Sequence, residues 1–416
     1  MDKLLLQAFD RQQDVVKRKW LTATLTRQLA EQNVEKPKMV EAMVDLLMAG
    51  GNTDTFAWRD GDDEAGEGVE PGDEPVRTLK LGISPADIAE FDRMQKDAIR
   101  ALPGIIGDAT KATAKSVLRR LLKDWPEAAE QRQLECDAFL FAHATWWEDA
   151  LEQLRMLQVM AVEEAQGEAR RIQKSRAKTN LAKRDVQFRL HVRICQVGDE
   201  ILTLLENGFA DGAMARWRTL HELVVVALLI YDHDDDLAQR YLDHEVVEAW
   251  NAAVMYQEVR VPYGDKPYSA KDMAAFTADR QAMLDKYGKS FGGEYGWAAH
   301  HLGVKAPSLK TLETAAGRVA LRSHYKMASY NVHAGPKGIA FRHGAGDNPA
   351  ANLAGRSMYG LEEPGCNTAF ALAQAAILFV EARKGIAHQV RGWTIVMLRD
   401  SVCRAFVKAG KAVRAA

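Results

Sequence analysis

The feature that most constrains the fold is an apolar segment, residues 224–230, that directly follows a charged stretch at residues 215–223. If the whole stretch is helical, Arg218, His221 and Glu222 lie at spacings of three and four and project from one face. Isolated charges are costly to bury, so these side chains must pair with one another or line a cleft. The sequence therefore predicts a largely buried helix with a polar site on one face.

A second polar stripe is predicted at residues 322–336. Four side chains recur there at spacings of four, three and four and share one helix face: Arg322, Lys326, Ser329 and His333. Gly335 and Pro336 then end the helix, which places His333 in its last turn. The negative end of the helix dipole favours an imidazolium at that position. Together, the two stripes predict a site between two helices.

Apolar residues with helical spacing dominate the rest of the chain, and the alternating pattern of strands is rare. We therefore expect an all-α fold, a multi-helix bundle with an N-terminal helical arm and a flexible acidic linker. Capping residues predict a helix start at Ser84, and a turn at residues 232–236 that ends one helix and caps the next. Further helices are expected at about 269–287, 308–334, 363–384 and 390–409. The predicted domains are an N-terminal helical unit (1–50), the acidic linker (51–83), a helical middle region (84–198) and a C-terminal helical domain with the cleft (199–416).

The net charge of −2 averages over two strongly charged blocks. Residues 51–75 hold many carboxylates among glycines, opposed only by Arg59, and this composition favours a flexible linker. The second block is basic, and we call the following residues the basic block: Arg170, Arg171, Lys174, Arg176, Lys178, Lys183, Arg184, Arg189 and Arg193. It is either a solvated surface or a strip that faces nucleic acid, because phosphate contacts need such clusters.

Composition excludes several classes of protein. The four cysteines show no CxxC spacing, so neither a disulfide framework nor a zinc knuckle is indicated, and a reducing cytoplasm fits best. No apolar run has the length of a signal peptide or a membrane span, so we expect a cytoplasmic protein with no membrane partner. His300 and His301 lack helical metal-ligand spacing, and no phosphate-loop, dinucleotide or serine-nucleophile motif is present. We therefore expect neither a metal nor another cofactor.

Several motifs resemble an uncharacterised bacterial family that is known only as a domain of unknown function. They are Asn207-Gly208, residues 216–223, Arg240-Tyr241 with His244, and residues 329–334. The likeness covers roughly residues 195–385. It implies a helical domain with an Arg-x-x-x-Glu helix, here Arg218 to Glu222, and a later helix that ends in histidine, here His333. No activity follows from this resemblance.

A broader resemblance is to the HEPN superfamily of bacterial RNases and RNA-binding helical domains, many of which belong to toxin–antitoxin and phage-defence systems. Its motif places an arginine four to six residues before a histidine, and Arg216 with His221 satisfies that spacing. The residue after the motif arginine is often polar in that superfamily, whereas here it is Trp217. Arg218 is therefore the better candidate of the two arginines. The resemblance implies an RNA substrate.

Metal-independent RNA cleavage needs a base, an acid and a cation that stabilises the charged phosphorane. His221 and His333 are the candidate base and acid, in either order. Arg218 and Arg216 are candidates for holding the phosphate, and Glu222 for orienting a guanidinium or an imidazole. The other candidate substrate-binding residues are Arg322, Lys326 and Ser329 of the second stripe, together with Tyr330 and Asn331, which flank His333. Tyr330 would stack on a base, and Asn331 would hydrogen-bond to one.

The preferred hypothesis is a bacterial RNase-like effector that acts on RNA in stress or phage defence. Its expected partners are RNA and either a second copy of the chain or a protein of the same defence system. The rival hypothesis is a non-catalytic helical scaffold or sensor that binds a nucleotide or a partner protein. In that case Arg218 and Glu222 form a structural ion pair, and the histidines only support helix ends. Whether the chain is an enzyme stays open at this point.

Overall fold

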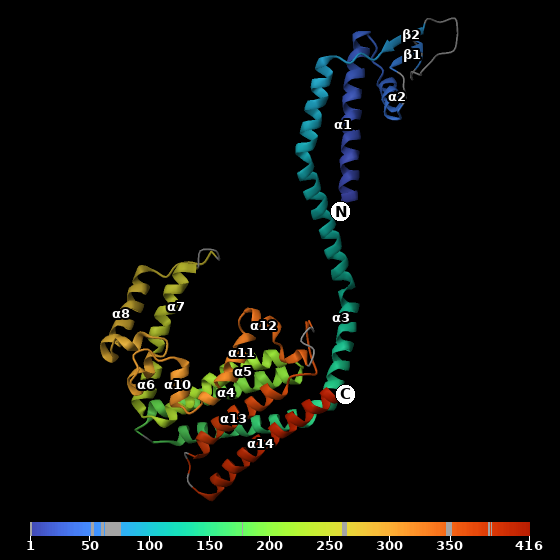
Figure 1. Cartoon of the computed structure of the whole chain (residues 1–416). Helices are drawn as coiled ribbons and strands as arrows, with labels where there is room; N and C mark the ends of the chain where they lie inside the picture. Colours follow the sequence, from blue (N-terminus) through green and yellow to red (C-terminus); the bar gives the residue numbers. More distant parts are fainter. Residues whose placement is uncertain are drawn as a thin grey trace. The chain divides into compact units, whose positions relative to one another are not determined.

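The computed structural model describes residues 2–50, 54–59, 62, 76–176, 178–259, 264–346, 352–381, 383 and 385–416. This part of the chain is almost entirely helical, with one small two-stranded sheet (Figure 1), so the predicted all-α fold is confirmed. The chain divides into two compact units, Met1–Gln131 and Arg132–Ala416. None of the helices described is long and apolar enough to cross a membrane.

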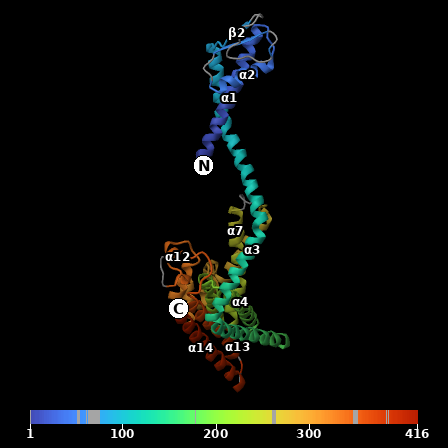
Figure 2. The ribbon, with the colours of Figure 1, turned by 90° about the vertical axis from the view of Figure 1, so that its right-hand side faces the viewer.

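The first unit contains α1 (Asp2–Glu31), α2 (Pro37–Met48), β1 (Thr55–Arg59), β2 (Val76–Lys80) and the first part of α3 (Pro85–Lys174). Figure 2 shows α1 and α2 together beside the sheet. The two strands are antiparallel, and Phe56 lies opposite Leu79. Phe56, Trp58 and Leu79 pack into one core with Leu25 of α1 and Met39 of α2. The sheet is therefore part of the core of this unit.

These strands lie inside the segment that the sequence predicts to be a flexible linker. The alternation of Phe56 and Trp58 with smaller or polar residues is a short strand pattern, and the high carboxylate content around it obscured this signal. Residues 51–53, 60–61 and 63–75, which hold most of the acidic side chains, lie outside the described residues. The prediction that the acidic stretch is flexible concerns mainly these residues and stays a prediction.

The predicted start of α3 is confirmed in detail. The Ser84 hydroxyl accepts a hydrogen bond from the Asp87 amide at 3.2 Å, and the Asp87 carboxylate accepts from the Ser84 amide at 2.9 Å. The Asp87 carboxylate also accepts a hydrogen bond from Arg27 Nη2 of α1 at 2.6 Å. The hydrogen bonds from Ser84, followed by that from Arg27, hold the pKa of Asp87 down at about 2. The carboxylate is thus ionised and fastens α3 to α1.

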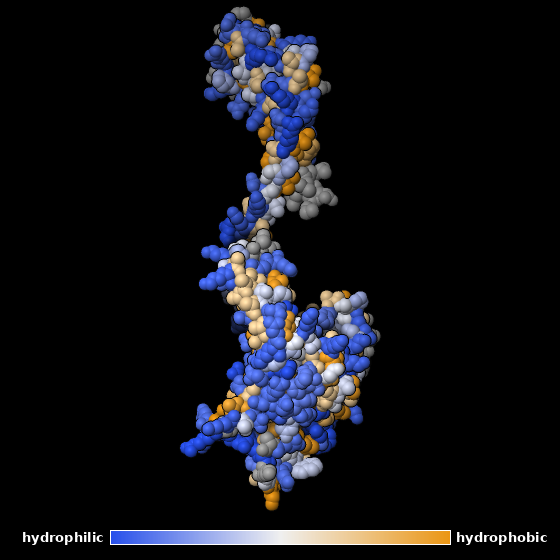
Figure 3. All heavy atoms as spheres, turned by 90° about the vertical axis from the view of Figure 1, so that its left-hand side faces the viewer, coloured by the Kyte–Doolittle hydropathy of each residue, from blue (hydrophilic) through white to orange (hydrophobic). Residues whose placement is uncertain are grey.

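The second unit is built around four long helices that pack with the last part of α3: α4 (Leu181–Glu206), α5 (Ala210–Asp232), α13 (Glu362–Glu381) and α14 (Ile386–Ala415). Helix α13 lies side by side with α14 (Figures 1 and 2). Gly365 permits this approach, because a Cβ atom there would lie 2.5 Å from the Phe406 ring. On the face drawn in Figure 3, hydrophilic side chains cover most of the surface, as expected when helices bury their apolar faces.

Shorter elements connect α5 to α13. They are α6 (Asp235–Asp243), α7 (Glu245–Val259), α8 (Ala270–Tyr287), η2 (Lys289–Gly292), η3 (Gly296–Ala298), α9 (Ala299–Leu302), α10 (Leu309–Ala315), η4 (Val319–Leu321), α11 (Arg322–Tyr330), α12 (Pro336–Ala340) and η5 (His343–Ala345). The Asp234 carboxylate caps α6 by accepting from the Leu237 amide at 3.2 Å, which confirms the predicted turn at residues 232–236.

The single helix predicted at residues 308–334 is wrong. Helix α10 ends at Ala315, and Gly317 adopts a left-handed conformation with φ of 66°. The Arg318 amide then bonds back to the Glu313 carbonyl at 2.7 Å, which is the hydrogen bond of a Schellman helix end. The chain turns at Gly317 and a new helix, α11, begins at Arg322.

Candidate functional site

A polar cluster lies where α5, α10 and α11 meet. Its members are Arg218, His221 and Glu222 of α5, Glu313 of α10, and Arg322 and Tyr325 of α11, and we call it the Arg218 cluster. Of the second predicted stripe, only Arg322 joins the polar side chains of α5, and it does so through Glu313, while Tyr325 makes the direct contact between α11 and α5. The packing of α5 against both α10 and α11 places them there.

One half of the cluster is partly exposed. The Arg218 Nε atom donates to the Tyr325 hydroxyl at 2.7 Å, and that hydroxyl donates in turn to Glu222 Oε1. Arg218 Nε also lies 3.3 Å from Glu222 Oε1, so the predicted i, i+4 ion pair is present. Burial, helped by the bond to Glu222, raises the pKa of Tyr325 to about 12. The phenol therefore stays protonated near neutral pH and links the two charges.

The other half of the cluster is buried. Glu313 has no exposed side-chain surface, and its two carboxylate oxygens lie 3.0 Å from His221 Nε2 and 2.7 Å from Arg322 Nη1. The His221 ring is packed between Trp217 and Tyr325, with centroid distances of 5.2 and 5.7 Å. Burial lowers the pKa of His221, although the nearby Glu313 acts in the opposite direction. Near neutral pH we infer a neutral imidazole that donates to Glu313.

This position gives His221 a supporting role. With 2% of its surface exposed, the ring lies out of reach of a dissolved substrate, and its Nε2 atom is occupied by Glu313. Glu313 in turn orients the Arg322 guanidinium, which is 40% exposed. Each oxygen of this buried carboxylate has one partner, so neither is left without a hydrogen bond, and the charged pair holds Arg322 in one orientation.

His333 lies outside this cluster. Helix α11 ends at Tyr330, so His333 follows in a turn and not in the last turn of the helix as predicted. Its side chain is exposed, and among the described residues no hydrogen bond, ion pair or ring contact joins it to the Arg218 cluster. Pro336 starts α12 and disfavours the helical conformation at Gly335, which is extended with ψ of 157°.

Arg216 lies on the same helix, α5, but its side chain points toward α4 and away from the Arg218 cluster. Its guanidinium forms an ion pair with Glu200 of α4, and Glu200 also lies 3.8 Å from Arg193. Arg216 is 28% exposed and Arg218 is 27% exposed, so the two arginines differ in their partners rather than in their accessibility. Only Arg218 joins the cluster.

The remaining candidates of the second stripe, and the neighbouring Tyr330 and Asn331, are spread around α11 and its end. Lys326 is exposed, and the Ser329 hydroxyl donates to the Tyr325 carbonyl at 2.9 Å. The Lys337 ammonium lies 5.0 Å from the Tyr330 ring centroid, and Asn331 follows the last residue of the helix. Among the described contacts, Arg322 is the member of the stripe that binds Glu313 of α10, and it reaches the α5 side chains only through that carboxylate.

Sequence reasoning missed Glu313 and Tyr325. Tyr325 stands three residues after Arg322, a spacing that puts both on one helix face, so a signal for it was available. Glu313 had no such signal. In a continuous helix its Cα atom would lie about 13 Å from that of Arg322 along the axis. The turn at Gly317 brings their side chains to 2.7 Å.

A second polar cluster anchors the segment after α12. Glu363 of α13 accepts from His324 Nδ1 at 2.5 Å and lies 3.8 Å from His343 Nδ1. The Asp211 carboxylate at the start of α5 accepts from the His343 amide at 2.7 Å. These contacts tie η5 to α5 and α13. In the described part of the chain, no group of three histidine, cysteine or acidic side chains is placed to hold a metal ion.

The fold and the cluster define a helical protein with a half-buried arginine, tyrosine and carboxylate site. Residues 184–350 match the model of a family of unknown function, DUF5677. The match begins in α4 and contains every member of the Arg218 cluster. It confirms the predicted resemblance to an uncharacterised domain of unknown function. Comparisons with curated proteins and with solved structures found no match.

Proposed function

We propose that the second unit acts on RNA and that the Arg218 cluster holds a phosphate of the backbone. The observation that carries this proposal is the placement of two partly exposed guanidinium groups over one tyrosine ring. Their central carbons lie 4.9 Å (Arg218) and 5.5 Å (Arg322) from the Tyr325 ring centroid. Guanidinium groups held in a fixed orientation suit the bidentate recognition of phosphate.

Further support comes from the way each arginine is held. Glu222 and Tyr325 fix Arg218, and the buried Glu313 fixes Arg322, so both cations are ordered before a ligand arrives. Binding to preorganised groups costs less conformational entropy than binding to mobile ones. Under this proposal His221 is a positioning residue, because it acts through Glu313.

In the catalytic form of the proposal, the protein is a bacterial RNase-like effector of stress or phage defence in the cytoplasm. The HEPN-like spacing of Arg216 and His221 suggests an RNA substrate, but neither residue would touch it in this form, because Arg216 pairs with Glu200 and His221 is buried. Since His221 is buried, the accessible acid and base candidates are Glu222, which is 34% exposed, and His333. The reaction would need no metal, and a second copy of the chain or another defence protein would be the partner.

The second candidate function is that of a non-catalytic sensor or scaffold. It is favoured by the internal pairing of the cluster, in which each charged group already has a partner of this chain. Such a network also serves to fix three helices in register.

The test compares Arg218→Gln with Arg216→Gln, because the two arginines lie on the same helix with equal exposure. Fluorescence anisotropy with a labelled single-stranded RNA measures binding, and gel electrophoresis with EDTA present measures cleavage. We expect Arg218→Gln to weaken RNA binding about tenfold, as loss of one charge-assisted contact would. Arg216→Gln should stay within about twofold of the wild type.

The possible results distinguish the enzyme from the sensor and can also refute the proposal. Cleavage in EDTA that is lost with Arg218→Gln supports the enzyme, whereas binding without cleavage supports the sensor. If both variants lose binding equally, the attraction is a general charge effect and the cluster is not the site. If the wild type neither binds nor cleaves RNA, the proposal is wrong.

A further inference from the structure

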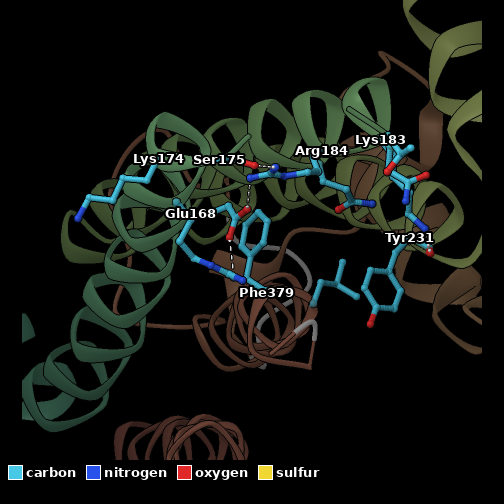
Figure 4. A pocket seen from close by; sticks show the side chains of 12 residues that line it. Glu168, Lys174, Ser175, Lys183, Arg184, Tyr231 and Phe379 are labelled. Carbon is cyan, nitrogen blue, oxygen red and sulfur yellow. Dashed lines mark hydrogen bonds and ion pairs between the residues drawn. The ribbon is translucent and has the colours of Figure 1, made fainter. Parts of the chain in front are cut away.

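A cavity of about 680 Å³ lies in the second unit, at the level where α3, α5 and α13 end and α4 begins. Members of the basic block line it: Arg171, Lys174, Lys183 and Arg184. Figure 4 shows Arg184, Glu168 and Phe379 together on one side and Lys183 with Tyr231 on the other, while Lys174 lies at the edge. The proposed RNA site does not use any of these residues.

The cavity carries an excess of positive charge. Glu168 is the single carboxylate among its lining residues, and it is shared by three guanidinium groups. Arg171 Nη1 lies 3.1 Å from it, Arg184 Nη2 lies 3.6 Å away, and Arg383 Nη2 lies 3.9 Å away. One negative charge is therefore divided among several cations, even though Arg383 has a second partner in Glu164 at 2.8 Å.

Neither of the two lysines forms an ion pair among the described residues, although the carboxylates of Asp232 and Glu381 lie near enough to act on Tyr231. The Lys183 ammonium donates to the backbone carbonyls of Tyr231 at 2.7 Å and His233 at 2.6 Å. Both acceptors are neutral, and an ammonium has a third N–H that these bonds do not use. Lys174 is exposed and has no ion pair there. Such an arrangement favours a multiply charged anion.

Part of the cavity wall is apolar. Tyr231, Leu378 and Phe379 supply aromatic and aliphatic surface. Burial raises the pKa of Tyr231, so its phenol adds no negative charge near neutral pH. A ligand that binds both the basic residues and the apolar wall carries phosphates at one end and a planar ring at the other. The volume is in the range of about 300–1,000 Å³ that is usual for small-molecule sites.

We infer that this cavity binds a free nucleotide, with its phosphates on the basic block and its base against Tyr231. The site is separate from the Arg218 cluster. Arg218 and Tyr231 stand thirteen positions apart on α5, which is about 20 Å along a helix. The inference is therefore independent of the proposed action on RNA.

The test is isothermal titration calorimetry of the full chain with ATP, pyrophosphate and adenosine. We expect ATP to bind at least about tenfold more tightly than either fragment, because only ATP reaches both parts of the wall. The double variant Arg171→Gln/Lys174→Gln removes two exposed charges that line the cavity and should weaken ATP binding about tenfold or more. Its matched control is Arg170→Gln/Arg176→Gln, which removes two exposed charges of the same block outside the lining.

A third variant, Tyr231→Leu, tests the aromatic wall while its backbone carbonyl still holds Lys183. It should weaken the binding of ATP and leave that of pyrophosphate unchanged. Equal losses in the two double variants would overturn the proposal in favour of a diffuse charge effect. Absence of ATP binding would overturn it too. So would binding of a 5′-phosphorylated RNA oligonucleotide alone, because the ligand would then be an RNA end.

Discussion

The buried carboxylate Glu313 offers the sharpest test of how the Arg218 cluster is held together. The substitution Glu313→Gln keeps the shape of the side chain but replaces one carboxylate oxygen by an amide donor. His221 can adapt, because its neutral ring can move its proton to Nδ1 and accept at Nε2. Arg322 cannot adapt, since all of its polar hydrogens are donors. It therefore exchanges a carboxylate at 2.7 Å for a neutral amide.

The expected cost follows from these contacts. Replacing a hydrogen bond between two charged groups by a weaker one costs about 2 kcal/mol here, because Arg322 is partly exposed and water offsets some of the loss. Glu313→Ala also leaves His221 without its partner and opens a small cavity, so we expect about 4 kcal/mol. At roughly 2 °C per kcal/mol for a unit of this size, the melting temperature should fall by about 4 °C and about 8 °C.

Differential scanning calorimetry of the full chain measures the shift. Hydrogen exchange on peptides from α10 and α11 assigns the loss of stability to the second unit. The control is Glu163→Gln, which removes an exposed carboxylate that pairs with Arg391 on the surface. If Glu313→Ala destabilises the chain no more than this control does, Glu313 does not hold Arg322, and the preorganisation argument for phosphate binding is refuted.

Three further predictions follow from burial and exposure. Burial, with a smaller effect from the Arg356 charge, holds the pKa of His143 at about 4 instead of 6.5. Unfolding therefore takes up a proton between these values, so stability should fall as the pH drops from 6.5 towards 4, and His143→Phe should flatten this slope in urea titrations. Trp58→Ala should destabilise the first unit by about 3–5 kcal/mol in chemical denaturation, whereas Thr78→Ala, on the exposed side of β2, should cost less than about 0.5 kcal/mol. His333→Ala should leave the melting temperature unchanged because the side chain is exposed, and retained RNA cleavage in this variant would remove His333 from the mechanism.

Local signals in the sequence predicted the fold class and several helix ends. Ser84 and Asp234 cap helices because their side-chain oxygens meet amides a few residues further on, and this contact needs no information from distant parts of the chain. The periodicity around Arg218 likewise predicted a buried helix with a polar face. Its core contacts are Trp217 and Leu220, both almost fully buried.

Contacts between residues that are far apart in the sequence could not be predicted from local patterns. The hairpin partner of Phe56 is Leu79, and the residues between the two strands give no indication of the pairing. At Gly317, the helical periodicity on both sides outweighed the glycine in the prediction. The stop was therefore missed, and with it the return of Arg322 to Glu313. The sequence predicted His221 as an acid or base candidate for the same reason, because its burial depends on the packing of α10 and α11.

Helix α5 supplies residues to both proposed sites, and its burial explains how one helix can serve two. Ala213, Trp217, Leu220, Val224 and Leu229 fasten its length to the core of the unit. Arg218 and Glu222 project from it toward α11, while Tyr231 reaches the cavity near its end. A rigid helix keeps these positions about 20 Å apart, beyond the range at which substitutions usually couple. The effects of Arg218→Gln on RNA and of Arg171→Gln/Lys174→Gln on ATP should therefore be separable, and coupling between them would require a second arrangement of α5.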